Sequence, residues 1–331
     1  MATSATRRKI RSVVVVGGTH GNERGGAHLA RYFDEQVPMD RWKTIRVSGV
    51  VANVEAVKKN TRYVDEDLNR CFTQVKLNEQ RDTYEAKRAQ ELNEMLGPKG
   101  NSKVDFIFDL HNSTSNTGMM LCFHHTDALA REVAAHLNRL DPKVRLVHWP
   151  TGDQPFLPTI GRSGVTVELG PVSHGTVHMP SVDRVLSLLL NGLDYLDRLN
   201  QEAPGGPREV HSVSIGERLA SVDFPRDPVT GDAQAFLNSS IQDIPELQDG
   251  SFLQPDQPLF SSIDGTVVER FDPKQYGLPP SMVNRNLYPV FVNEAAYFEK
   301  RTAFFLYHRV DGIKVKLLPM EALQKRQKVS E

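Results

Sequence analysis

Residues 10–33 read IRSVVVVGGTHGNERGGAHLARYF and predict a β-strand, a loop and an α-helix in succession. The β-branched run from Ile10 to Val16 ends in two glycines, and a continuous apolar run closed by glycine is typical of a buried parallel strand. Gly25 to Phe33 then carries apolar residues at helical spacing. A strand, a loop and a helix in this order are the opening of an α/β fold.

The same alternation continues to about residue 200. Strands are expected at Ile45–Val54, Val104–Leu110 and Gly164–Leu169, and helices at Tyr84–Leu96, Ala128–Leu140 and Ser181–Leu199. The segment EAPGGP, residues 202–207, is a turn-rich linker, and short β-like runs follow it. The sequence therefore predicts an α/β catalytic domain at residues 1–203 and a smaller β-rich domain at residues 208–331.

The composition of the chain excludes several classes of partner. The 331 residues carry a formal net charge of −1, so no overall field attracts nucleic acid or an anionic membrane. The apolar runs are far too short for an integral membrane span. The two cysteines, Cys71 and Cys122, favour a reduced compartment over a disulfide framework. We expect a cytoplasmic protein that recognises a small molecule at a local site.

Two predicted strands end in side chains that bind metals. His20 and Glu23 lie in the loop after the first strand, and His111 directly follows the strand Val104–Leu110. Open α/β sheets keep their sites at the carboxyl ends of strands, which favours a meeting of these side chains. Two histidines and one glutamate, with one position left for water, form a typical catalytic zinc set. The alternative is that both histidines are ordinary loop residues, because His-x-x-Glu alone is a weak motif.

The glycines of the same loop suggest a phosphate cradle, but the pattern does not fit one. Gly17, Gly18 and Gly21 match neither the dinucleotide-binding motif nor the P-loop motif, since Thr19 occupies the position of a required glycine. The chain also lacks a G-x-S-x-G nucleophile elbow, which disfavours a serine hydrolase.

Other candidate residues carry charge. Glu168 interrupts a buried strand, where desolvation would raise its pKa towards that of a general base, or a salt bridge would neutralise it. Arg62, Asn69 and Arg70 lie in one irregular stretch and could hold a substrate carboxylate or polarise a carbonyl. The alternative is a solvated loop in which neighbouring acids, residues 65–67, neutralise the arginines.

Five motifs occur in the order that is typical of one family. They are HGNE (20–23), DEDLNR (65–70), DLHN (109–112), VELGP (167–171) and YPVFVNEAAYFEK (288–300). From about Val13 to about Phe305 the chain resembles the aspartoacylase and aminoacylase-3 family of zinc-dependent N-acyl amino acid amidohydrolases. The resemblance implies a zinc-carboxypeptidase-like mixed sheet flanked by helices, with a β-rich C-terminal domain that caps the active site.

The resemblance also implies a role for each candidate residue. One Zn²⁺ per subunit would be held by His20, Glu23 and His111. Glu168 would activate the attacking water, and Arg62 would polarise the acyl carbonyl. Asn69, Arg70 and Tyr297 would bind the substrate, Tyr297 from the C-terminal domain. Homo-oligomerisation is left open by the resemblance.

The family likeness differs at one position that bears on the substrate. Aspartoacylases carry an arginine ten residues before the catalytic glutamate, whereas this chain has Pro158 there, with Arg162 nearby as a substitute. Phe156 and Leu157 would suit a less polar pocket. We therefore expect an enzyme like aminoacylase-3, acting on N-acetyl aromatic amino acids and S-substituted N-acetylcysteines. The alternatives are an aspartoacylase that hydrolyses N-acetylaspartate, a metallocarboxypeptidase and a metal-binding interaction protein without turnover.

Overall fold

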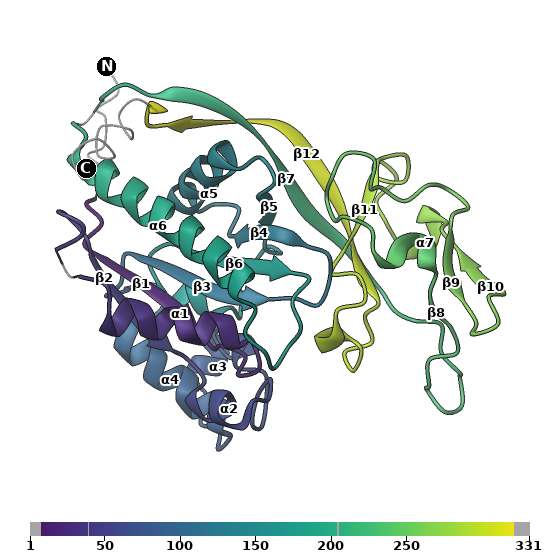
Figure 1. Cartoon of the computed structure of the whole chain (residues 1–331). Coiled ribbons are helices and arrows are strands. Elements are labelled where there is room, and N and C mark those ends of the chain that lie inside the picture. Colours follow the sequence, from purple (N-terminus) through teal and green to yellow (C-terminus); the bar gives the residue numbers. More distant parts are fainter. Residues whose placement is uncertain (1–7, 39, 204, 321–331) are drawn as a thin grey trace.

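A computed structural model describes residues 8–38, 40–203 and 205–320 (Figure 1). Within these residues, nine strands form one mixed sheet in the order β11-β12-β7-β5-β4-β6-β3-β1-β2. The strands are β1 (Ser12–Gly17), β2 (Arg46–Val51), β3 (Phe106–Asn112), β4 (Gly118–Phe123), β5 (Arg145–His148), β6 (Gly164–Gly170), β7 (Glu209–Val222), β11 (Leu287–Val290) and β12 (Phe304–Leu317). β1 pairs in parallel with β2 and β3, and β3 with β6, whereas β4 runs antiparallel to β6. The predicted mixed α/β class is confirmed.

Helices cover both faces of this sheet. They are α1 (Arg24–Glu35), α2 (Val54–Lys59), α3 (Gln74–Asn78), α4 (Tyr84–Leu96), α5 (Ala128–Leu140) and α6 (Met179–Gln201), with the short α7 (Ser239–Gln242) near the C-terminal sheet. Successive strand residues point to opposite faces, and β1 shows this directly. Val13 and Val15 pack into the core under α1, α5 and α6, whereas Val14 and Val16 pack into the core under α4. The apolar run of β1 is therefore buried on both sides.

The predicted helices begin and end within two residues of those in the structure, whereas the strands β1, β2 and β3 each differ by two or more residues at an end. The expected helix Tyr84–Leu96 is α4 without change. The expected strand 45–54 is too long, because Asn53 caps α2: its side chain accepts a hydrogen bond from the backbone N–H of Ala56. β3 begins two residues later than expected and extends to Asn112, so His111 lies within the strand and not after it.

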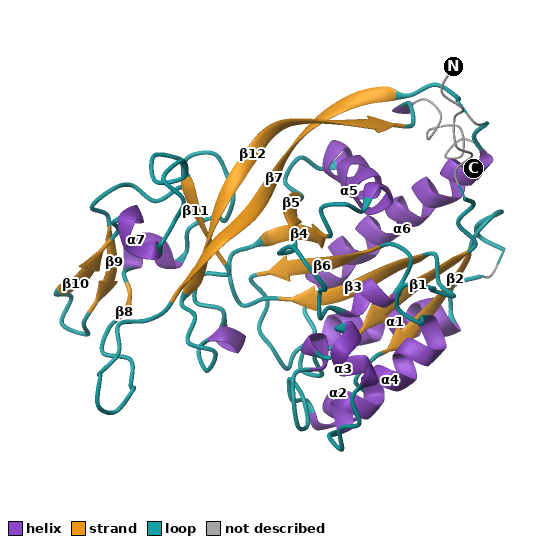
Figure 2. Cartoon of the chain, turned by 180° about the vertical axis from the view of Figure 1, so that it is seen from behind, coloured by secondary structure: helices purple, strands orange, loops and turns teal. Residues whose placement is uncertain are grey.

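The chain after residue 208 extends the large sheet. β7 and β12, of 14 residues each, pair antiparallel, and β7 also pairs with β5 (Figure 2). In the described part of this region a separate three-stranded sheet contains β8 (Phe236–Leu237), β9 (Pro258–Ser261) and β10 (Val267–Arg270). The region is β-rich as expected. The pairing of β5 with β7 joins the parts of the chain before and after the predicted linker in one sheet. The division into domains at 203 and 208 stays a prediction.

Two further observations concern disulfide bonds and membrane-spanning helices. Cys71 and Cys122 are both buried and free. Among the described helices, none combines the length and the apolar character that a membrane crossing needs. The basic tail after Leu318, expected to be frayed, lies mostly outside the described residues.

Candidate active site

The loop between β1 and α1 is held tightly by neighbouring backbone. A Cβ atom at Gly17 would lie 1.9 Å from the carbonyl oxygen of Gly26 in α1, and one at Gly21 would lie 2.0 Å from the carbonyl carbon of Ala56 in α2. Glycine is therefore required for the close approach of two helices. This packing explains why glycines occur in the loop, and no bound phosphate is needed to explain them. It also places His20 and Glu23 at the end of β1.

His20, Glu23 and His111 converge as the sequence predicts. The Nδ1 atom of His20 lies 2.7 Å from Glu23 Oε1, and the Nδ1 atom of His111 lies 2.9 Å from Glu23 Oε2. The two Nδ1 atoms are 3.1 Å apart. All three side chains are buried, and one ligand atom of each lies within 4.8 Å of the others. This geometry makes the three residues a metal-binding candidate.

The far side of each imidazole faces a second carboxylate. His20 Nε2 lies 3.1 Å from Asp67 Oδ1, and His111 Nε2 lies 2.9 Å from Asp109 Oδ2. A histidine that donates its Nε2–H to a carboxylate keeps its Nδ1 lone pair free, which is the usual arrangement of a metal ligand. Two such lone pairs and the Glu23 carboxylate then face one another, so a cation between them suits the residues present.

The contacts of these two carboxylates with the histidines were not predicted. Asp109 was not singled out in the sequence, and Asp67 was considered only as a partner of the arginines. Asp109 is two residues before His111 on β3, and residues two apart on a strand share a face. The D-x-H spacing was thus a signal that could have identified Asp109. The hydroxyl of Thr19 donates to Asp109 over 2.7 Å, which helps to hold its carboxylate.

The charge balance keeps Glu23 ionised. Burial alone would raise the pKa of Glu23, but the neighbouring His20 and His111 hold it well below its usual range. The backbone N–H of Asn112 also donates to Glu23 Oε2 over 3.1 Å. The Glu23 carboxylate is therefore both oriented and negatively charged.

Glu168 lies on β6 directly beside His111, with their Cα atoms paired in the parallel ladder. Burial raises the pKa of Glu168 to about 8. The negative charges of Glu23 and Glu294 also raise this pKa, whereas His111 lowers it. The described residues provide no ion pair for Glu168. This favours the general-base interpretation over the structural salt bridge.

Arg62 lines the pocket beside the metal-binding candidates, with its side chain 15% exposed. Its two terminal nitrogens lie 3.5 Å from Glu23 Oε1 and 3.3 Å from Asp67 Oδ2. Its Nε atom is buried and finds no protein partner in the described structure. Arg62 thus keeps a donor available beside the metal-binding candidates.

Asn69 and Arg70 form the adjacent wall. Asn69 Oδ1 accepts a hydrogen bond from the backbone N–H of Leu157 over 3.0 Å. Arg70 donates to the carbonyl oxygen of Asn69 over 2.8 Å, and its guanidinium carbon lies 5.4 Å from the ring centre of Phe156. Both side chains line the pocket together with Arg62 and Glu168.

The acidic residues near these arginines have other partners, with one exception. Glu66 pairs with Arg81 over 2.6 Å, and Asp65 accepts a hydrogen bond from the backbone N–H of Tyr84. Asp67 does contact Arg62. The alternative in which neighbouring acids neutralise the arginines therefore holds in part for Asp67. It fails for Asp65 and Glu66.

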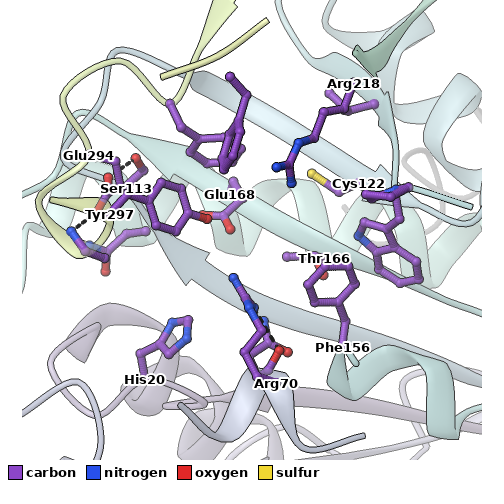
Figure 3. Close-up of a pocket in the computed structure, with 18 of the residues that line it drawn as sticks. His20, Arg70, Ser113, Cys122, Phe156, Thr166, Glu168, Arg218, Glu294 and Tyr297 are labelled. Carbon is purple, nitrogen blue, oxygen red and sulfur yellow. Dashed lines mark hydrogen bonds between the residues drawn. The ribbon is translucent and has the colours of Figure 1, made fainter. Parts of the chain in front are cut away.

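The pocket is closed by residues of the C-terminal region. It encloses about 790 Å³ of empty space, counted out to its open mouth. Tyr297 lies in the pocket as predicted, and burial raises its pKa to about 12. Figure 3 shows Tyr297 and Glu294 on one side of Glu168 and Arg218 on the other. The sequence analysis missed several lining residues, namely Cys122, His148, Trp149, Arg218, Phe291, Glu294, Phe305 and Tyr307.

Pro158 and Arg162, expected near the substrate side chain, lie elsewhere. Both line a different cavity from the one that contains Glu168. Pro158 is buried at the start of the 3-10 helix Leu157–Ile160, and Arg162 pairs with Asp105 over 3.0 Å. The expectation that Arg162 could substitute for the missing arginine is therefore wrong. Phe156 does line the pocket.

Comparisons with known proteins agree with this geometry. Residues 9–196 match the family described as the succinylglutamate desuccinylase/aspartoacylase catalytic domain. The N-acyl-aromatic-L-amino acid amidohydrolase (carboxylate-forming) of Xenopus laevis is 36% identical over 306 residues, which cover 89% of this chain and 93% of that protein. The aspartoacylase of Rattus norvegicus is 33% identical over 313 residues, covering 92% and 94%.

A solved structure extends the likeness to the whole fold. The crystal structure of murine aminoacylase 3 matches with a TM-score of 0.80 and 34% identity, covering 95% of this chain and all (100%) of that one. The chain belongs to the succinylglutamate desuccinylase/aspartoacylase family. The resemblance inferred from the five motifs is confirmed.

Proposed function

We propose that the protein is a zinc-dependent amidohydrolase that cleaves N-acyl amino acids into a carboxylate and the free amino acid. The observation that carries the proposal is the set of three inward-facing ligand atoms of His20, Glu23 and His111 beside Glu168. Zinc suits two imidazoles and one carboxylate, and we infer one ion per chain. A zinc ion bound there would supply a Lewis acid and lower the pKa of a bound water to about 7.

The residues of the chain divide the reaction among them. Glu168 takes a proton from the attacking water as the new C–O bond forms, and it returns a proton to the amine nitrogen as the C–N bond breaks. Arg62 donates to the developing oxyanion through its Nε–H group, which has no partner among the described residues. Asn69 and Arg70 bind the α-carboxylate of the substrate, and Tyr297 closes the pocket beside them.

The walls of the pocket favour an aromatic side chain on the substrate. Trp149 and Phe156 have ring centres 5.3 Å apart, and Phe291 and Phe305 line the same cavity. Aromatic rings stack well on such walls. This composition, with the name of the Xenopus relative, supports N-acetyl aromatic amino acids as substrates, followed by S-substituted N-acetylcysteines. The free cysteines support a cytoplasmic location.

Zinc analysis and a substrate panel test this proposal. We expect about one zinc per chain and a kcat/KM for N-acetyl-L-tyrosine at least about tenfold above that for N-acetyl-L-aspartate. Chelation should abolish turnover and added zinc should restore it. His111→Ala should lose zinc, whereas His136→Gln, at a buried histidine outside the pocket, should keep it.

Each alternative has its own outcome in this experiment. Preference for N-acetyl-L-aspartate would identify an aspartoacylase, and cleavage of peptides would identify a carboxypeptidase. Zinc binding without turnover of any substrate would identify a metal-binding protein without catalysis.

A further inference from the structure

The pocket contains a third arginine that the reaction does not use. Arg218 lies on β7 and reaches into the cavity from the side opposite Arg70 (Figure 3). Cys122, Thr166 and Phe156 lie on this side of the pocket, away from His20 and Tyr297. We propose that Arg218 is a specificity-determining residue that binds an anionic group on the aromatic side chain of the substrate. This inference rests on the proposed function.

The guanidinium of Arg218 is held in place without losing its donors. Its central carbon lies 3.8 Å from the ring centre of Phe305 on β12, a stacking distance. A guanidinium stacked on a ring presents its N–H groups at its edge. Within the described residues, it has neither a carboxylate partner nor a hydrogen-bond acceptor. The side chain is therefore oriented by an apolar contact, and its polar edge is available to a ligand.

The other two pocket arginines differ in this respect. Arg62 is paired with Glu23 and Asp67, and Arg70 donates to the Asn69 carbonyl oxygen. Arg62 belongs to the metal-binding end of the pocket, and Arg70, which binds the α-carboxylate in the proposed reaction, borders both that end and the Phe156 ring. A substrate with one α-carboxylate would engage that end and leave Arg218 without an anion.

The groups near Arg218 supply no competing negative charge. The adjacent Glu217 lies 3.5 Å from His148 Nδ1. Burial raises the pKa of the Cys122 thiol and of the Tyr307 phenol, so both stay neutral. The carboxylates that line the cavity, Glu23, Glu168 and Glu294, belong to the metal-binding end of the pocket. The side-chain compartment thus combines aromatic walls with one unpaired cation.

A flat aromatic group with a terminal carboxylate complements this compartment. Its ring would stack on Trp149 and Phe156, and its carboxylate would accept hydrogen bonds from the Arg218 fork. Arginine binds carboxylates through two parallel N–H groups, which lysine cannot do. N-acetyl-4-carboxy-L-phenylalanine is the probe that carries both features, and N-acetyl-L-phenylalanine is the probe that lacks the charge.

The test compares kcat/KM for the two probes in the zinc-loaded protein. We expect the ratio of carboxylated to plain probe to fall about tenfold in Arg218→Met, as for loss of a charge-assisted hydrogen bond. Arg218→Lys should give an intermediate ratio. Because Arg218 is exposed, the wild-type ratio should also fall as salt is added. Lys314→Met, on β12 and outside the cavity, is the control for an equal change of net charge.

Calorimetric binding of both probes separates this inference from the proposed function. If neither probe is hydrolysed, the proposed function fails, but the binding ratio in wild type and Arg218→Met still reports on Arg218. An Arg218→Met ratio within twofold of wild type, or an equal fall in Lys314→Met, would overturn the inference.

Discussion

The metal-binding end of the pocket and its C-terminal wall are built in different ways. His20 and Glu23 come from the loop between β1 and α1, His111 comes from β3, and each is at most 5% exposed. Each also has a second polar contact that orients it, to Asp67, Asn112 or Asp109. Arg218 and Tyr297, by contrast, come from the part of the chain after residue 208 and are held mainly by ring contacts. We infer that the first region carries the chemistry and the second selects the substrate.

Glu294 joins the two regions. It is buried and accepts hydrogen bonds from the Ser113 hydroxyl, the Thr114 backbone N–H and the Thr114 hydroxyl. Ser113 directly follows β3, whereas Glu294 follows β11, so this contact connects distant parts of the chain. Lys300 adds a second polar attachment, because its Nζ lies 2.5 Å from Asp67 Oδ2, whereas Tyr297 and Arg218 rest mainly on aromatic contacts.

The largest expected effect tests the chemistry of the first region. Glu168→Gln removes the general base while keeping the shape of the side chain, so kcat should fall by about 10²- to 10⁴-fold with zinc retained. Steady-state kinetics and metal analysis measure both quantities. Glu246→Gln is the matched control, because burial also raises the pKa of Glu246 to about 8 but the residue does not line the pocket. Wild-type turnover in Glu168→Gln would refute its assigned role.

A smaller effect is expected at the wall. Tyr297→Phe keeps the ring contacts with Phe291 and Phe305 and removes the hydroxyl. Loss of one hydrogen bond to the substrate should raise KM about tenfold, with a smaller change in kcat. Tyr276→Phe, whose hydroxyl bonds Glu269 away from the pocket, should leave KM unchanged. A fall in kcat as large as that of Glu168→Gln would remove the distinction between the regions.

The smallest effects concern stability, and two buried groups outside the pocket, His136 in α5 and Glu246 in the C-terminal region, should respond to pH in opposite directions. Burial lowers the pKa of His136 in α5 to about 3, so its contribution is complete above pH 6.5 and is lost as pH falls, by roughly 2 kcal/mol at pH 5. Burial raises the pKa of Glu246 to about 8, so its contribution is lost as pH rises from about 4.5 to 8. Urea unfolding across pH should give a flatter acid limb in His136→Gln and a flatter alkaline limb in Glu246→Gln. Unchanged limbs would contradict the assignment.

The first region was largely predictable because its signals are local. The apolar run of β1, the glycines after it and the histidine at the end of β3 are all visible within short windows of sequence. β4 and β5 were missed, although both are mostly buried, since their runs are short and neither is followed by a candidate site residue. Asp109 was missed although its spacing from His111 was a local signal, because the expected strand ended at Leu110 and His111 was assigned to the loop after it.

By itself the sequence predicted the α/β class, the three candidate metal ligands, Glu168 and the Arg62–Arg70 stretch, because strand ends and motif order place these residues without long-range information. Only the tertiary structure decided that β7 and β12 extend the same sheet and that Arg218 stacks on Phe305 over the cavity. The physical reason is that the register of two strands whose paired residues are 82 to 108 positions apart depends on packing across the whole sheet, for which no short segment carries a signal.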